Sequence, residues 1–240
     1  MKIVVSKGAD ELSVKAAAEF VAIAEDSIRQ RGSFNVALSG GSTPLLLYRR
    51  LVEAAVEWDR VSFYFGDERN VPPDEDASNF KGANKELFRP LRIREDKIHR
   101  WRTELETPDA VADDYEQVLR RLSTDAPRFD LVLLGMGADG HTASLFPGTK
   151  GVDETERSAI ANWVPQLGMW RFTLTFTAFN HARNLMFLVT GSDKADTLRS
   201  VIEGEPRPDT LPAQRIVPAD GTLSWFVDQA AASKLSDVNI

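Results

Sequence analysis

Short apolar runs rich in β-branched residues recur along the chain, and most are separated by segments whose apolar positions follow a helical spacing. The predicted strands are Ile3–Val5, Phe34–Leu38, Val61–Phe65, Phe129–Leu134, Phe172–Phe176 and Leu185–Thr190. A final strand and helix are expected over Leu223–Leu235. This alternation of strand and helix is typical of βαβ units.

Helical periodicity predicts four helices between these runs. They cover Asp10–Arg29, Thr43–Ala55, Pro108–Leu122 and Lys194–Ile202. Asp10 or Ser13 is expected to cap the first helix, because short polar side chains satisfy free amides at helix starts. Continuous apolar strands such as Leu131–Leu134 indicate burial on both faces, hence a mostly parallel sheet. The predicted fold class is α/β, with three layers in which helices flank a central sheet.

Length favours one domain over residues 1–240, because the loops around Val71–Ala77 and Gly204–Pro212 are too short to mark a boundary. The chain is 42% hydrophobic and 27% charged, which is typical of a globular protein with a substantial core. The first residues lack the features of a signal peptide, and no stretch approaches the ~20 apolar residues of a membrane span. We therefore expect a cytoplasmic protein.

Charge and cysteine content exclude several classes of function. The net charge of −7 disfavours nucleic acid or an anionic membrane as the main partner. Zero cysteines exclude disulfides, iron–sulfur clusters and thiolate zinc sites, and the three histidines are scattered, with no paired ligands such as HExxH. We expect no metal and no cofactor, and an anionic substrate would need locally placed Arg and Lys.

Ligands of open parallel sheets collect beyond the carboxyl ends of the strands, so residues that follow predicted strands are candidates for the site. The first such segment is Ser39-Gly40-Gly41-Ser42-Thr43-Pro44. Glycines allow a phosphate to approach the backbone, and free amides with the helix dipole favour negative charge. Gly40, Gly41, Ser42 and Thr43 are therefore candidate phosphate ligands. The alternative is a tight turn in which Ser42 or Thr43 serves only as a helix cap.

The second segment is Gly66-Asp67-Glu68-Arg69, directly after another predicted strand. Arg69 is suited to bind a phosphate or carboxylate through two hydrogen bonds. Asp67 or Glu68 would bond sugar hydroxyls or hold Arg69 in position. The alternative is a solvated charged loop, the default for charged residues.

The third segment runs from Gly135 to Gly148 and holds the strongest candidate, His141. Three glycines surround Asp139 and His141 at the end of a buried strand, which places the histidine at the mouth of the sheet. Histidine titrates near neutral pH and is a natural general base for activating water. Asp139 would orient the imidazole or bind substrate.

Four other basic side chains are weaker candidates. Arg171 stands at the start of its predicted strand, and Lys194 follows the next strand. Both are candidates to neutralise a phosphate. Alternatively, the stem of Arg171 only covers the core and Lys194 only begins a helix. His99 is expected at a strand edge or an interface, and His181 in a helix between strands. Neither histidine has the glycine context of His141.

Taken in order, the motifs resemble the 6-phosphogluconolactonase family. The resemblance rests on Ser39–Pro44, on Gly66–Arg69 with Val71-Pro72 and Ser78-Asn79, and on Gly135–Pro147. Arg171 and Gly191-x-x-Lys194-Ala195 extend it into the C-terminal third. It implies a Rossmann-like (NagB/RpiA-like) fold without a nucleotide cofactor, and hydrolysis of 6-phospho-D-glucono-1,5-lactone to 6-phosphogluconate in the oxidative pentose phosphate pathway.

Two alternatives stay open. Glucosamine-6-phosphate deaminases resemble the chain at its glycine motifs, but they typically follow the histidine with Asn-Glu-Pro, where this chain has Leu145-Phe146-Pro147. Their second motif tends to read Asp-Glu-Tyr instead of Asp67-Glu68-Arg69. A non-catalytic sugar-phosphate sensor is the other alternative. The expected partner is the small-molecule substrate alone, with the chain as a monomer or a homodimer.

Overall fold

The computed structural model describes residues 1–122 and 127–236. Its centre is a six-stranded sheet in the order β1-β9-β8-β5-β2-β3, in which every neighbouring pair is parallel. The strands are β1 (Lys2–Ser6), β2 (Phe34–Leu38), β3 (Val61–Phe65), β5 (Leu131–Leu134), β8 (Asn184–Val189) and β9 (Thr222–Asp228). The predicted α/β class and mostly parallel sheet are confirmed.

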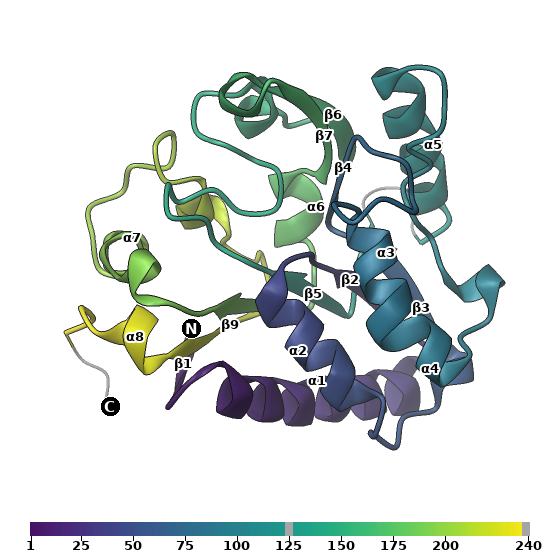
Figure 1. Ribbon diagram of the computed structural model, residues 1–240, viewed down its shortest axis with the longest axis horizontal. Helices are drawn as coiled ribbons and strands as arrows, with labels where there is room; N and C mark the ends of the chain where they lie inside the picture. The colour runs from purple at the N-terminus through teal and green to yellow at the C-terminus, as the bar shows by residue number, and fades with distance from the viewer. Residues whose placement is uncertain (123–126, 237–240) are drawn as a thin grey trace.

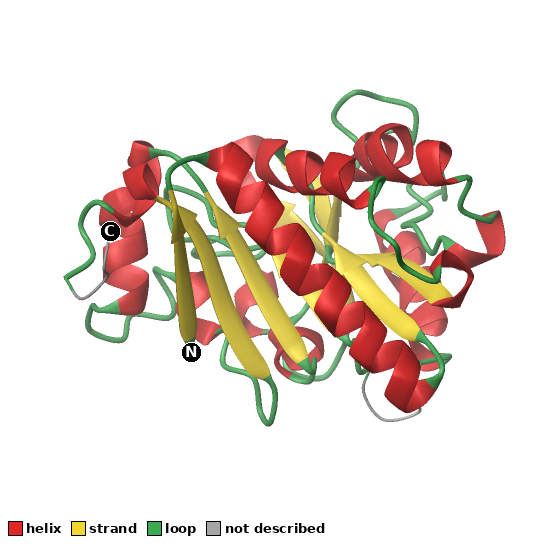
Figure 2. Ribbon diagram, turned by 90° about the horizontal axis from the view of Figure 1, so that it is seen from below, coloured by secondary structure: helices red, strands yellow, loops and turns green. Residues whose placement is uncertain are grey.

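Helices cover both faces of this sheet. The long helix α1 (Ala9–Arg31) lies along one face beside α2 (Ser42–Leu51), while α5 (Pro108–Arg120) and α6 (Phe176–Asn180) lie on the other side (Figures 1 and 2). The helices α7 (Ala195–Ile202) and α8 (Gln229–Ala232) pack against each other near the edge formed by β1 and β9. Burial of the central strands between these layers explains their continuous apolar sequences.

A second, antiparallel sheet corrects one prediction. It contains β4 (Asp67–Arg69), β7 (Met169–Leu174) and β6 (Ala159–Val164) in the order β4-β7-β6. The run Phe172–Phe176 was expected in the main alternating series, but its strand ends at Leu174 and belongs to this second sheet. The reason is the short turn Pro165–Leu167 between β6 and β7, because so short a connection joins only antiparallel strands.

Several element boundaries also differ from the predictions. Helix α1 begins after Gly8, which has no side-chain cap, and the Ser13 hydroxyl donates to the carbonyl of Asp10 instead of capping. A helical stretch that the sequence did not predict follows β4. It consists of α3 (Asn79–Ala83), the π-turn Asn84–Phe88 and α4 (Arg89–Leu91). Short 3₁₀ turns lie at Trp58–Arg60, Glu95–Lys97, Lys150–Asp153, Pro165–Leu167, Ser192–Lys194 and Pro212–Arg215.

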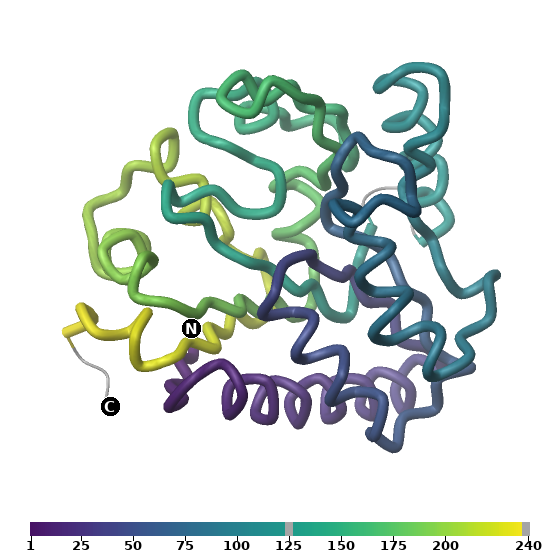
Figure 3. The backbone as a smooth tube through the Cα atoms, viewed as in Figure 1, coloured from purple at the N-terminus to yellow at the C-terminus, as the bar shows by residue number. Residues whose placement is uncertain are grey.

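The strand order places a ligand crevice between β2 and β5. From β2 the chain moves outward to β3 at one edge, whereas from β5 it moves to β8 in the other direction. Neighbouring strands whose connections leave in opposite directions open a gap at their carboxyl ends, the general position of ligand sites in such sheets. Figure 3 lets the reader follow the chain beyond these two strands. No helix within the described ranges is long and apolar enough to cross a membrane.

Candidate active site

A pocket of about 260 Å³ lies at the carboxyl ends of β2 and β5. Its walls come from four parts of the chain: the loops after β2, β5 and β8, and the segment from β4 into α3. The lining residues are Ser39, Gly40, Asp67, Arg69, Asn79, Gly135, Met136, Gly137, His141, Ala143 and Lys194. The structure thus brings together candidates that are separated by more than 150 positions in the sequence.

The turn after β2 is fixed by a buried tyrosine of α2. The Tyr48 hydroxyl donates to the carbonyl of Ser39 at 2.6 Å and accepts from the Ser39 amide at 3.1 Å. Gly41 caps α2 with a φ of 101°, a conformation that favours glycine. Gly40 lines the pocket, and a Cβ there would overlap the Asn79 amide, its Oδ1 at 1.7 Å. This turn therefore needs both glycines.

The other predicted members of this turn take different positions. Gly41 and Ser42 are exposed at the start of α2. Thr43 is buried, and its hydroxyl shares a 2.8 Å hydrogen bond with the Thr190 hydroxyl. That bond joins the turn after β2 to the loop that carries Lys194. Of the four candidate phosphate ligands, Gly40 is the one whose residue lines the pocket in the described structure.

The acidic pair after β3 divides into two roles. These residues form strand β4, so the alternative of a solvated charged loop is wrong. Asp67 lines the pocket and accepts hydrogen bonds from Ser144 Oγ at 2.7 Å and Asn79 Nδ2 at 3.1 Å. Glu68 faces away and accepts from the amides of Asn79 and Phe80 at 2.7 and 2.8 Å. Glu68 therefore stabilises the start of α3, and it is not among the residues that line the pocket.

Two arginines stand side by side next to the pocket. Arg69 of β4 and Arg171 of β7 are register partners in the antiparallel pair. Arg69 lines the pocket and donates to the carbonyl of Ala77, whereas Arg171 is not itself among the lining residues. Burial, together with the charge of Arg69, lowers the pKa of the Arg171 guanidinium. Its buried Nε and Nη1 have no hydrogen-bond partner within the described residues, an arrangement that favours an anion close by.

The third segment holds His141 tightly. Its Nδ1 lies 2.5 Å from Asp139 Oδ1. A Cβ at Gly137 would lie 2.1 Å from Nδ1 and 2.2 Å from Cε1, so only glycine leaves room for the ring. The Phe146 ring stacks on the imidazole, with centroids 4.0 Å apart and planes inclined by 25°. The imidazole is thus held from three directions while its residue lines the pocket.

The pairing with Asp139 fixes which imidazole nitrogen is basic. Partial burial acts to raise the pKa of Asp139, but the hydrogen bond and charge of His141 outweigh it and lower that pKa below its usual value. Asp139 is therefore ionised at neutral pH and can only accept a hydrogen bond. The proton of a neutral His141 must then reside on Nδ1, which leaves the Nε2 lone pair free to accept a proton.

The backbone amides of this loop are partly engaged. The Gly137 amide donates to the carbonyl of His141 at 2.9 Å, and the Gly140 amide donates to the carbonyl of Gly137 at 3.1 Å. Both amides therefore donate within the loop itself. Lys194, at the end of the turn after β8, lines the pocket with its Nζ 3.0 Å from Asp193 Oδ2. It supplies a cation from the loop after β8.

The other two histidines lie outside the pocket wall. His99 stacks on Tyr64 with ring centroids 4.5 Å apart, and burial lowers its pKa. His181 immediately follows α6, and its Nδ1 lies 3.3 Å from the carbonyl of Pro127. Among the residues that the structure describes, no group of three or more His, Cys, Asp or Glu side chains is placed to share a metal ion.

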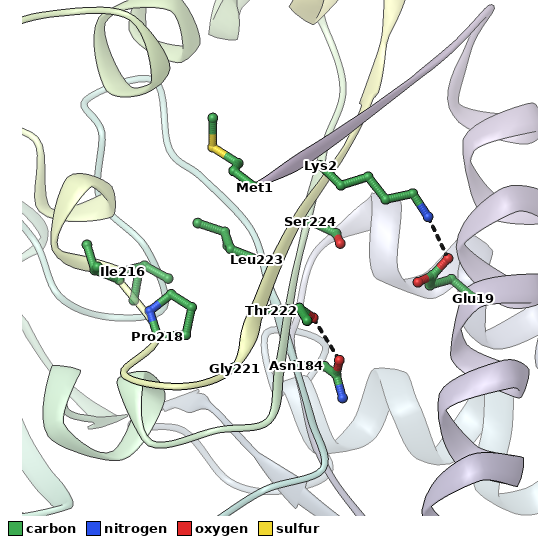
Figure 4. A pocket seen from close by; sticks show the side chains of 11 residues that line it. Met1, Lys2, Glu19, Asn184, Ile216, Pro218, Gly221, Thr222, Leu223 and Ser224 are labelled. Carbon is green, nitrogen blue, oxygen red and sulfur yellow. Dashed lines mark hydrogen bonds and ion pairs between the residues drawn. The ribbon is translucent and has the colours of Figure 1, made fainter.

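A larger hollow of about 610 Å³ lies at the opposite end of the sheet (Figure 4). Four of its polar side chains form two pairs: Lys2 with Glu19 at 3.0 Å, and Thr222 with Asn184 at 2.7 Å. Neither a histidine nor an arginine lines it. Its chemistry is therefore poorer than that of the pocket around His141, despite its size.

Sequence reasoning did not assign several residues that complete the pocket. Asn79 and Ala143 line it, and Ser144 and Phe146 hold its functional groups. Ala143 has a φ of 48°, unusual for a residue with a side chain. No local pattern signals these roles, because each depends on a partner brought close by the fold.

Comparisons with known proteins agree on one family. The family of glucosamine-6-phosphate isomerases and 6-phosphogluconolactonases matches residues 7–225. A 6-phosphogluconolactonase of Chlamydia trachomatis is 35% identical over 99% of this chain and 92% of its own length. One from Synechocystis is 37% identical over 87% of this chain and 88% of its own. The structure of a 6-phosphogluconolactonase from Trypanosoma brucei superposes with a TM-score of 0.88 at 30% identity, covering 98% of both chains.

Proposed function

The chain belongs to the family of glucosamine-6-phosphate isomerases and 6-phosphogluconolactonases, and from that premise we propose that it hydrolyses 6-phospho-D-glucono-1,5-lactone to 6-phosphogluconate. This reaction is the second step of the oxidative pentose phosphate pathway. The observation that carries the proposal is the His141–Asp139 pair, with a free Nε2, in a strand-end pocket that also holds Arg69 and Lys194.

His141 acts as the general base in this proposal. Nε2 takes a proton from water as the water oxygen attacks C1 of the lactone. When the tetrahedral intermediate collapses, the bond from C1 to the ring oxygen breaks and the imidazolium returns the proton to that oxygen. Asp139 keeps Nδ1 protonated throughout and stabilises the imidazolium. Such assistance typically accelerates a reaction by about 10²–10⁴-fold.

The cations in and beside the pocket are suited to the phosphate group. Arg69, Arg171 and Lys194 supply three positive charges against the carboxylates of Asp67 and Asp139. We assign the phosphate to these cations and to the turn formed by Gly40, Gly41, Ser42 and Thr43. Asp67 would accept hydrogen bonds from sugar hydroxyls. Binding energy from the distant phosphate then positions C1 beside His141.

A coupled assay tests the proposal. Freshly generated 6-phosphogluconolactone is supplied at a pH low enough to suppress its spontaneous hydrolysis, and 6-phosphogluconate is measured with wild type, His141→Ala and His141→Gln. We expect a loss of about 10²–10⁴-fold in kcat for both variants. His181→Ala, which lies outside the pocket wall, is the matched control. A folded His141 variant with near wild-type turnover would show that His141 is not the base.

Two further measurements separate the alternatives. Release of ammonia from glucosamine 6-phosphate would reveal a deaminase, although no carboxylate follows His141 in the sequence Leu145-Phe146-Pro147. A sugar-phosphate sensor would bind the lactone without turnover. A cytoplasmic location, and a monomer or a homodimer as the working form, complete the proposal.

A further inference from the structure

Phe146 is buried in an unusual place for a large apolar side chain. It is 7% exposed, yet it does not belong to the contiguous hydrophobic core that contains its neighbour Leu145. The aromatic ring in contact with it is the imidazole of His141, 4.0 Å away between centroids. Its burial therefore serves the histidine more than the core.

The backbone of Phe146 is anchored independently of its ring. Its carbonyl accepts two hydrogen bonds from Thr149, from the hydroxyl at 2.8 Å and from the amide at 3.2 Å. The Thr149 hydroxyl in turn accepts from Asn162 Nδ2 at 2.9 Å, and Asn162 is a buried residue of β6. The backbone of Phe146 is thus linked through Thr149 to Asn162 of the second sheet, whereas Asp139 and Gly137 belong to the loop of His141 itself.

Two contacts within that loop leave one movement of the imidazole uncontrolled. Asp139 holds Nδ1, and Gly137 leaves room for Nδ1 and Cε1, which a Cβ at that position would overlap. A hydrogen bond to one nitrogen lets a planar ring tilt about that bond. A stacked aromatic face opposes such a tilt, because tilting loses the ring-to-ring contact. Reacting groups need to be held within about 0.5 Å and 10–20° of the productive geometry.

We propose that Phe146 is a positioning residue that sets the plane of the His141 imidazole and so aims Nε2 at the attacking water. The inference rests on the proposed role of His141 as a base. Phe146 itself touches neither water nor substrate in this mechanism. Its contribution is confined to kcat, because the phosphate is bound by other residues.

The test compares Phe146→Leu, which removes the flat face but keeps an apolar side chain, with Phe146→Tyr, which keeps the face. For Leu we expect kcat to fall by about tenfold or more with KM within about twofold, and for Tyr we expect most of kcat to return. The matched control is Phe176→Leu, since Phe176 is also 7% exposed but belongs to the core. It should lose stability and keep kcat.

An NMR measurement keeps the test independent of activity. The chain has three histidines, so the imidazole signals of protein labelled at histidine are readily assigned with His141→Gln. Stacking predicts that a ring proton of His141 is shifted upfield in the wild type, and that Phe146→Leu removes this shift. An inactive wild type would refute the proposed function. The NMR shift would still test whether the Phe146 ring stacks on His141. Equal kcat in Phe146→Leu and Phe176→Leu, or no upfield shift in the wild type, would overturn the inference.

Discussion

Ser144 Oγ donates a 2.7 Å hydrogen bond to Asp67 Oδ2 and so joins the loop of His141 to strand β4. Both residues are buried, with 2% and 8% of their surfaces exposed. The carbonyl of Ser144 also accepts from Asn162 Nδ2 at 2.9 Å, which extends the link to β6. One hydroxyl therefore connects the side of the pocket that carries His141 to the side that carries Asp67 and Arg69.

Replacement of Ser144 by Ala should weaken both stability and activity. Asp67 would lose one of its two side-chain donors while staying buried, and a hydrogen bond to a charged group contributes about 1.5–3 kcal/mol. We expect a loss of that size in the free energy of unfolding, measured in urea, and a roughly tenfold loss in kcat/KM. Ser224→Ala, a buried serine at the opposite end of the sheet, should keep kcat/KM. Unchanged stability in Ser144→Ala would refute the importance of this bond.

Gly137→Ala should abolish the His141–Asp139 pair. The added Cβ would lie 2.1 Å from Nδ1 and 2.6 Å from Asp139 Oδ1, far inside van der Waals contact, so the imidazole must move. We expect kcat to fall by at least about 10²-fold, the lower range for loss of a general base. Gly8→Ala is the control, because its Cβ meets nothing within 4 Å and it precedes α1. Full activity of Gly137→Ala in steady-state assays would contradict the observed packing.

Much of the main sheet is predictable from sequence because its strands are locally distinctive. The bounds predicted for Phe34–Leu38 and Val61–Phe65 coincide with β2 and β3, whose apolar residues are buried on both faces. The second sheet is not predictable in this way. Strand β4 consists of Asp67, Glu68 and Arg69, and its pairing with β7 depends on backbone contacts across more than 100 positions. No local propensity records such a partner.

The candidate site divides along the same line. His141, Asp67, Arg69, Lys194 and Gly40 are predictable because each follows a strand, and the fold brings the ends of parallel strands together. Asn79 and Ser144 act through Asp67 of β4, and Phe146 acts through His141, and no local pattern records these contacts. Glu68 shows the converse limit: its charge suggested a ligand, but its position on β4 directs it to the amides of α3.

Glu68→Gln should destabilise the fold and change its pH dependence. Glu68 accepts hydrogen bonds from three backbone amides and from Ser78 Oγ. The side-chain –NH₂ of a glutamine would face one of these donors, which lowers the free energy of unfolding by about 1–3 kcal/mol. Burial raises the pKa of Glu68 above 4.5, against the opposing effect of these hydrogen bonds. Between the ordinary pKa and the raised pKa, the folded protein keeps this proton while the unfolded chain has lost it. The contribution of Glu68 to the free energy of unfolding therefore falls as pH rises through its raised pKa.

Urea unfolding between about pH 4 and pH 8 tests this, because Glu68→Gln cannot titrate and should lack that part of the slope. Glu57→Gln, an exposed residue in a surface ion pair, should differ from wild type by less than about 0.5 kcal/mol. Parallel curves for wild type and Glu68→Gln would refute the raised pKa.

Arg171→Met should stabilise the protein and impair its binding of phosphate. The half-buried guanidinium has two buried nitrogens without partners within the described residues, it stands next to Arg69, and its pKa is lowered by partial burial. Methionine fills similar space without a charge to desolvate, so we expect a gain of about 1 kcal/mol in the free energy of unfolding without ligand. A charge-assisted contact is worth about 1.5–3 kcal/mol, so KM for the phosphorylated lactone should rise by about 10-fold or more.

Thermal unfolding with inorganic phosphate separates this explanation from a general effect of the substitution. Phosphate that binds the folded state raises Tm with its concentration, and this rise should be large in wild type and small in Arg171→Met. Arg29→Met, whose side chain is 75% exposed, should respond to phosphate as wild type does. If Arg171→Met is less stable than wild type without phosphate and keeps the full phosphate response, Arg171 is a structural residue. The combination of higher stability and weaker binding is expected only if the fold keeps a costly buried charge for its ligand.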